Sequence, residues 1–146
     1  MKGLLFWVLS LTWGILMTAF GLLVSLVLLI AGVRPSRWRW FLCFEVGAGW
    51  GGFECGPMFV VERGAPESMR CHEAGHGVQN ILFGPLMPFL VSIPSAVRYW
   101  ARRIALARGR RDLPPYDGIW FEGQATRWGT KLFGGTQHKP RLRRIK

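Results

Sequence analysis

Cysteine is scarce in this chain of 146 residues, and the three cysteines, Cys43, Cys55 and Cys71, include no C-x-x-C pair. An odd number of thiols without such a pair argues against a disulfide framework, and thiols that face the cytoplasm stay reduced. If the domain faced outward instead, Cys43 and Cys55 could form a bridge. The length of the chain fits one domain.

Acidic residues are also few, with 8 Asp and Glu against 19 Lys and Arg, which gives a formal net charge of +11. In a soluble protein of this size such a charge would suggest nucleic-acid binding. Here the basic residues flank apolar stretches, a pattern that favours contact with the anionic surface of a lipid bilayer. We therefore expect a membrane partner and no nucleic acid.

Charge is absent altogether from Leu4 to Val33, a run of thirty residues. A transmembrane helix needs only about 20 apolar residues, whereas the apolar core of a secretory signal is about 7 to 15 residues long. The sequence therefore predicts one retained transmembrane helix over residues 1–33. Three arginines follow it and outweigh Lys2, so the positive-inside rule places the rest of the chain on the cytoplasmic side of the cell membrane. These are Arg34, Arg37 and Arg39.

Residues 38–61 are rich in Phe and Val, which favour strands, and they surround the glycine-rich run 47–52. This pattern predicts a small glycine-rich β-hairpin. Three glutamates are spaced through it, and we expect each to be solvated or paired with a nearby arginine. They are Glu45, Glu54 and Glu62.

Histidine occurs only three times, yet two of the three fall in the motif His72-Glu73-x-x-His76. On an α-helix, residues i and i+4 share one face, so His72 and His76 can direct two imidazoles at one metal ion. Zn²⁺ is the usual ion for this motif, with a third protein ligand and one open position for water. The carboxylate of Glu73 lies beside that position and can take a proton from the water. The motif predicts a catalytic zinc site.

The helix that carries the motif is expected to begin near residues 66–68, where Pro and Glu suit a first turn, and to end near Gly84. Asn80 falls on the face of His72 and His76, where it could orient a ligand or a substrate carbonyl. A solvent-facing amide is the alternative interpretation of Asn80.

Residues 81–97 are again uncharged, but three prolines interrupt them, which predicts a re-entrant or interface-embedded segment. A helix is expected from Pro94 to about Arg108, with an apolar stripe and four arginines, and should lie on a membrane surface. The sequence predicts a last helix over residues 118–133 and a basic tail over residues 136–146.

Two acids after the proline-rich loop can supply the third zinc ligand. Asp117 precedes Gly118 at a helix start, where a role as N-cap already explains it. Glu122 lies about one turn inside the helix among apolar and small neighbours, where a carboxylate needs a partner and another helix can come close. Glu122 is the preferred ligand on these grounds, and Asp117 is the alternative.

Together these residues resemble the gluzincin layout, in which a second helix supplies a glutamate as the third zinc ligand. The match consists of His72-Glu73-x-x-His76 followed on a later helix by Glu122-Gly123-Gln124-Ala125. The segment from Cys71 to Trp128 also resembles small bacterial membrane proteins with an H-E-x-G-H core. The resemblance implies a membrane-anchored zinc metallopeptidase whose ligands are His72, His76 and Glu122.

This chain departs from the gluzincin pattern at Thr126, because gluzincins often carry an aspartate there that bonds a ligand histidine. A metzincin is excluded by pattern, since Gln79 and Leu82 stand where its glycine and third histidine should be. The site-2 intramembrane proteases share the H-E-x-G-H core and a proline-rich Asp-Gly motif, which resembles residues 113–118. Residues 62–70, just before the core, are too polar for a membrane helix of that class.

These observations predict a mainly α membrane protein with a transmembrane helix (1–33), a membrane-associated zincin-like domain (34–135) and a basic tail (136–146). The expected function is hydrolysis of peptide or protein substrates by metal-activated water, with Glu73 as general base. A non-catalytic membrane-anchored scaffold or chaperone-like subunit that retains a metal site is the alternative. So short a chain leaves little room for a walled substrate cleft, which favours a small peptidase or a subunit that needs a partner.

Overall fold

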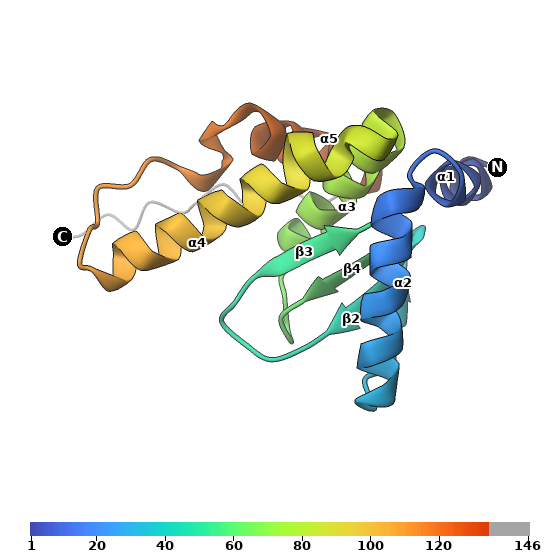
Figure 1. Ribbon diagram of the computed structural model, residues 1–146, viewed down its shortest axis with the longest axis horizontal. Helices are drawn as coiled ribbons and strands as arrows, with labels where there is room; N and C mark the ends of the chain where they lie inside the picture. The colour runs from blue at the N-terminus through green and yellow to red at the C-terminus, as the bar shows by residue number, and fades with distance from the viewer. Residues whose placement is uncertain (135–146) are drawn as a thin grey trace.

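The computed structural model describes residues 1–134 and is mainly helical with one small sheet (Figure 1). This confirms the predicted fold class at that level, while the predicted tail 136–146 lies outside the described residues. The elements are α1 (Lys2–Leu11), α2 (Ile15–Ile30), β1 (Ser36–Trp38), β2 (Phe41–Glu45), β3 (Gly52–Cys55), β4 (Met58–Val61), α3 (Glu67–Phe83), η1 (Gly84–Leu86), η2 (Pro88–Ser92), α4 (Ile93–Ala107), η3 (Tyr116–Gly118) and α5 (Trp120–Phe133).

The uncharged N-terminal run forms two helices, α1 and α2, which meet at an angle of 92°. The prediction of one continuous helix over residues 1–33 is therefore wrong. The bend closes on tight contacts: the Thr18 hydroxyl donates to the Ser10 carbonyl at 2.7 Å, and a Cβ on Gly14 would lie 2.5 Å from the Asn80 amide nitrogen.

Among residues 1–134, no single helix is long and apolar enough to cross a bilayer. Two sharply bent pairs satisfy the length and composition, namely α1 with α2, and Glu67–Leu86 with Pro88–Ala107, which is bent by 118°. The second bend falls within the uncharged segment 81–97, which the structure shows to be helical on both sides of its prolines.

The sheet has the strand order β1-β2-β4-β3, in which β2 and β4 run parallel and β3 and β4 run antiparallel. The predicted hairpin across residues 47–52 is wrong, because β2 and β3 do not pair and β4 lies between them. All four residues of β4 are buried, and such a continuous apolar strand is best placed at the centre of a sheet covered on both faces. The glycine-rich loop instead carries the chain from β2 to the outer edge of the sheet.

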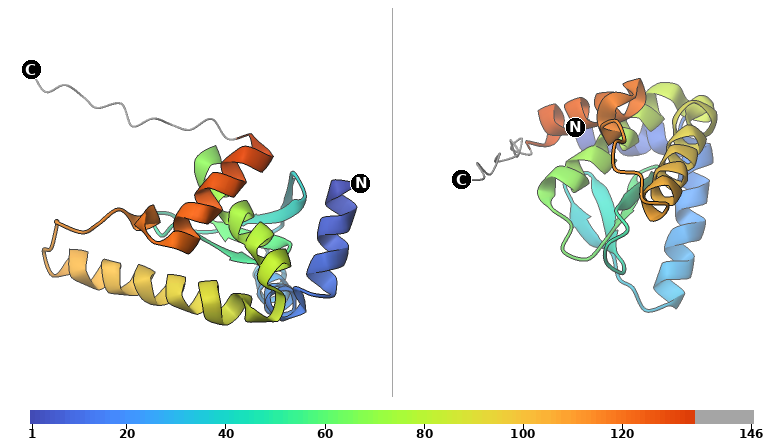
Figure 2. Two further views of the ribbon diagram at one scale, coloured as in Figure 1. Left: turned by 90° about the horizontal axis from the view of Figure 1, so that it is seen from above. Right: turned by 90° about the vertical axis from the view of Figure 1, so that its left-hand side faces the viewer.

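Helices cover both faces of the sheet, with α2 on one side and α3 and α5 on the other (Figure 2, right view). On the α2 side, a Cβ on Gly21 would lie 2.1 Å from the carbonyl oxygen of Cys55, so the helix lies directly on the β3–β4 turn. Cys43 and Cys55 are buried free thiols, and no bridge joins them.

The predicted bounds of α3 and α4 are confirmed, and α5 begins two residues later than predicted. The N-cap of α5 is Ile119 without a side-chain cap, and Asp117 lies in the preceding turn η3. The capping role predicted for Asp117 is therefore wrong.

Helices α3 and α5 touch backbone to backbone through two glycines. A Cβ on Gly75 would lie 2.0 Å from the Ala125 carbonyl oxygen, and one on Gly129 would lie 1.7 Å from the Cys71 carbonyl oxygen. Both distances are far below any real carbon–oxygen contact, so these positions exclude every side chain. This contact fixes the spacing of the two helices that carry the predicted metal ligands.

Substitution of either contact glycine should separate α3 from α5. Gly75→Ala and Gly129→Ala are each expected to lower the free energy of unfolding by about 1 to 3 kcal/mol, because backbone cannot yield as a side chain can. Gly118→Ala is the matched control, since a Cβ there meets nothing within 4 Å. Thermal unfolding measures the difference, and equal stability of the three variants would contradict this packing.

Candidate metal centre

The contact between α3 and α5 brings three side chains to one point. The Nε2 atoms of His72 and His76 are 3.2 Å apart, and they lie 3.0 Å and 3.3 Å from Oε2 of Glu122. The three side chains are half-buried or buried and could hold a metal ion. Four ligands at about 2.0 Å around a tetrahedral ion stand about 3.3 Å from one another. The three atoms thus already have nearly the spacing that tetrahedral zinc requires.

Helix geometry explains how each ligand arrives. His72 and His76 are one turn apart on α3, so their rings stack edge to face with centroids 4.7 Å apart. Glu122 lies in the first turn of α5, which crosses α3 at this level. Its carboxylate is fully buried, and the two imidazoles are the groups that can compensate it.

Each ligand is also held from behind by a neutral side chain. Nδ1 of His72 lies 2.9 Å from the Thr126 hydroxyl, and Nδ1 of His76 lies 2.7 Å from Oε1 of Gln79. When Nδ1–H of His76 donates to that amide oxygen, the lone pair of Nε2 is left to face the centre. Thr126 therefore contacts a ligand histidine from the position that gluzincins give to an aspartate.

Glu122 is oriented from a third helix. The Ser95 hydroxyl, near the start of α4, donates to Oε1 of Glu122 at 2.5 Å and lies 3.3 Å from the Tyr116 hydroxyl. This leaves Oε2 free to face both histidines. Burial raises the pKa of Tyr116 to about 12, so its hydroxyl stays protonated beside the centre at neutral pH.

Sequence reasoning missed Gln79, Ser95 and Tyr116. The position of Gln79 three residues after His76 was a usable signal, because residues i and i+3 are neighbours on a helix. Ser95 and Tyr116 carried no local signal, since only the tertiary fold brings α4 and η3 to Glu122.

Two residues that the sequence singled out lie away from the centre. Asn80 is fully buried, and its amide nitrogen lies 3.5 Å from the Gly14 carbonyl oxygen at the bend between α1 and α2. It is neither a ligand-orienting group nor a solvent-facing amide, because the bend between α1 and α2 covers that face of α3. Asp117 is exposed and takes no part in the group of ligands.

Glu73 lies beside the ligands with only 5% of its surface exposed. A Cβ on Gly52 of β3 would lie 2.9 Å from its Oε1, so the carboxyl group lies between the sheet edge and α3. Burial raises the pKa of Glu73, while the two histidines act in the opposite direction. A carboxylate with a raised pKa is a better proton acceptor than an exposed one.

The structure corrects the prediction for one of the three sheet glutamates. Glu54 is 7% exposed, accepts a hydrogen bond from the Gly56 amide, and has its pKa raised to about 8 by burial. Glu45 pairs with Arg70 at 2.7 Å as expected. Glu62 accepts hydrogen bonds from the backbone amides of Trp50 and Gly51 in the glycine-rich loop.

The charges of His76 and Glu122 depend on each other. Burial alone would lower the pKa of His76, but its hydrogen bond to Glu122 and the nearby carboxylates raise it to about 9. Burial would likewise raise the pKa of Glu122, but its hydrogen bonds to His72 and His76 lower it. Without metal, an imidazolium–carboxylate pair therefore occupies the centre, and a dication can replace the proton.

No protein-family model, curated protein or solved structure matches this chain.

Purified protein is expected to hold about one Zn²⁺ per chain. His72→Ala, His76→Ala and Glu122→Ala should each lose the metal, because two remaining protein ligands are too few for tight binding. Asp117→Asn is the matched control and should keep it. Elemental analysis by mass spectrometry gives the stoichiometry, and loss of zinc from Asp117→Asn with retention in Glu122→Ala would overturn the ligand set.

The metal-free protein should be stabilised by the His76–Glu122 pair only within a window of pH. The pKa of His76 in the folded protein, about 9, lies above its ordinary value of 6.5, so this contribution is complete below pH 6.5 and is lost as pH rises through about 9. The pKa of Glu122 is lowered, so its contribution is present above its ordinary pKa and is lost in acid.

Thermal unfolding of chelator-treated protein tests this window. The Tm of the wild type should fall between pH 6.5 and about 9, and the fall should be smaller in His76→Gln, where only the buried acids, chiefly Glu54 with its pKa of about 8, still contribute to it. A wild-type Tm that changes no more than that of His76→Gln over this range would show that the pair does not form.

Proposed function

We propose that this protein is a membrane-bound zinc-dependent peptidase. The observation that carries the proposal is the convergence of two histidine nitrogens and one glutamate oxygen at 3.0–3.3 Å, with the buried carboxyl group of Glu73 beside them. Three protein ligands leave a fourth position open for water or substrate, which is typical of catalytic rather than structural zinc sites.

The residues around the centre suit hydrolysis of a peptide bond. Zinc held there would polarise the scissile carbonyl and acidify the attacking water. Glu73 would accept the proton of that water and later pass it to the leaving amine, since its burial keeps its pKa raised. Ser95 and Thr126 would keep Glu122 and His72 in place through the cycle.

The N-terminal helices support a place at the cell membrane. More than ten large apolar side chains of α1 and α2 are exposed, among them Leu5, Leu23 and Ile30 at 59%, 60% and 79%. Such a surface is unfavourable in water, and a lipid bilayer is the partner that the uncharged composition fits. The three arginines that follow α2 favour a domain on the cytoplasmic side.

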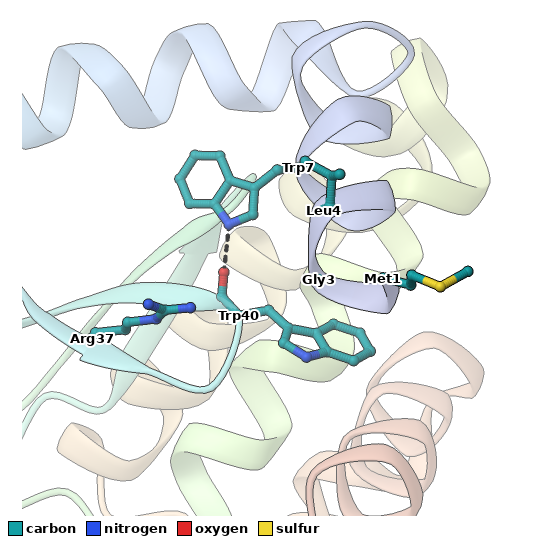
Figure 3. A pocket seen from close by; sticks show the side chains of 6 residues that line it. All are labelled: Met1, Gly3, Leu4, Trp7, Arg37 and Trp40. Atoms are coloured by element: carbon teal, nitrogen blue, oxygen red, sulfur yellow. Dashed lines mark hydrogen bonds between the residues drawn. The ribbon is translucent and has the colours of Figure 1, made fainter.

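A second candidate is a non-catalytic scaffold or a subunit that needs a partner. Two hollows in residues 1–134 lie away from the ligands. One lies along α4, and the other is formed by α1 and the β1–β2 turn, where the Trp7 indole donates to the Trp40 carbonyl at 2.7 Å (Figure 3). Neither hollow is lined by His72, His76 or Glu122, so each could receive a partner subunit without contact with the centre.

The site-2 intramembrane protease alternative is less well supported. That class takes its third ligand from an Asp-Gly motif, and Asp117 lies exposed outside the group that could hold the metal.

Glu73→Gln separates the peptidase from the scaffold. The amide keeps the shape of the side chain but cannot accept the proton, so the cleavage rate should fall about 10²- to 10⁴-fold while zinc content and Tm stay unchanged. The readout is hydrolysis of a quenched-fluorescent peptide library by zinc-loaded protein. The control is Glu62→Gln, just after β4. Equal hydrolysis by wild type and Glu73→Gln, or none by either, would favour the scaffold.

A further inference from the structure

An exposed apolar stripe runs from Leu86, just before the bend at Pro88, to the last turn of α4. From Leu90 onward its members recur at alternating steps of three and four residues, which is the spacing of one helix face. Between 42% and 63% of the surface of each is exposed. They are Leu86, Leu90, Ile93, Val97, Trp100 and Ile104. The stripe therefore continues from η2 into α4, and nothing in residues 1–134 covers it.

The opposite face of α4 is bound to the rest of the protein. The Tyr99 hydroxyl donates to the Trp50 carbonyl at 2.6 Å, and the guanidinium of Arg98 donates to the Pro115 carbonyl at 2.8 Å. Ser95, on the same side, orients Glu122. The helix is thus fixed by one face, and its apolar face cannot turn inward to be buried.

Cations accompany the stripe, and acids are nearly absent. Residues 92–115 contain a single acid, Asp112, whose carboxylate is 3.8 Å from Arg110. The groove between α4 and the following loop is lined by Arg98, Arg102 and Arg110 and otherwise by apolar side chains and prolines. The arginines of this stretch number six: Arg98, Arg102, Arg103, Arg108, Arg110 and Arg111. An apolar stripe accompanied by arginines fits the surface of a lipid bilayer, whose interior is apolar and whose headgroups can be anionic.

Helix α4 lies on the same side of the molecule as α2. Seen from above, α4 runs along one edge of the molecule, and α2, viewed end-on, lies at the same edge (Figure 2, left view). The two helices run in different directions along that side (Figure 1). Helix α2 also exposes apolar residues such as Leu22 and Leu26, and it contains no charged residue.

We propose that η2 and α4 lie in the plane of an anionic membrane surface, with the stripe inserted below the headgroups and Arg108, Arg110 and Arg111 at the level of the phosphates. A helix with these two faces is stable at such an interface, where apolar burial and attraction to anionic lipid add. A bilayer fits better than a protein partner, because this stretch carries six arginines against one acid. Arg98, Arg102 and Arg103 donate to carbonyl oxygens of this chain, whereas Arg108, Arg110 and Arg111 are exposed at the end of the helix and just beyond it.

The proposed contact of α4 with the membrane has a consequence for the metal centre. Ser95 and the stripe are on the same helix, so lipid contact on one face holds the group that orients Glu122 on the other. The proposed membrane contact does not depend on the peptidase function, because it is argued from residues other than the metal ligands.

An environment-sensitive NBD label on Val97→Cys or Ile104→Cys tests the membrane insertion of the stripe in full-length protein. The native thiols are at most 1% exposed, so the introduced cysteine is the one that reacts. The protein is reconstituted in phosphatidylcholine vesicles with about a quarter of phosphatidylglycerol, which supplies the anionic charge. Nitroxide lipids report depth, with the spin label either near the headgroup or deep in the acyl region.

Both labels should be quenched several-fold more by the shallow nitroxide than by the deep one. Leu132→Cys on α5 is the matched control, because Leu132 is 48% exposed and Ile104 is 50% exposed, and its label should be quenched by neither. In vesicles without phosphatidylglycerol, quenching at both stripe positions should weaken. Arg108→Gln with Arg111→Gln should weaken it in the anionic vesicles.

Three results would overturn the proposal. Equal quenching of the stripe labels and the Leu132 label would leave a protein as the occupant of the stripe. Stronger quenching by the deep nitroxide at Val97 or Ile104 would show that the segment crosses the bilayer. Quenching that is indifferent to anionic lipid would remove the role of the arginines.

Discussion

The close contact between α3 and α5 is the constraint on which the candidate centre depends. Gly75 and Gly129 allow the two helix backbones to touch, and the carbonyl oxygens of Ala125 and Cys71 occupy the space of the missing side chains. At this spacing the short reach of a glutamate is enough for Glu122 to meet both histidines. A wider separation of the two helices would move the Glu122 carboxylate away from both imidazoles.

The charges near this contact give a physical reason for a metal. Three carboxyl groups, of Glu54, Glu73 and Glu122, are buried around two histidines in the space between β3, α3 and α5. Buried carboxylates are unfavourable unless they are paired with positive charge. Here that charge can come from a protonated histidine or from a bound divalent metal ion. The raised pKa of His76 corresponds to a protonated histidine, and the geometry of the ligand atoms favours a bound metal ion.

The sequence was a good guide where the signal was local. Helical periodicity and Pro and Gly boundaries predicted α3 and α4, and the reasoning that a carboxylate among apolar neighbours needs a partner selected Glu122. It failed where long-range contacts decide. The central place of β4, the bend at Gly14 against Asn80 and the approach of Ser95 all arise from pairs of residues far apart in the chain. Hydrophobicity alone does not distinguish a straight apolar helix from a bent pair of helices, so it could not predict the break between α1 and α2.

The proposed function requires one zinc ion bound by the imidazoles of His72 and His76 and the carboxylate of Glu122. X-ray absorption spectroscopy at the zinc edge on the purified protein tests it most directly. The account predicts a four-coordinate shell of nitrogen and oxygen atoms at about 2.0 to 2.2 Å with the multiple scattering of two imidazoles. A sulfur shell at about 2.3 Å, which would indicate the cysteines, or a spectrum without imidazole scattering would contradict it.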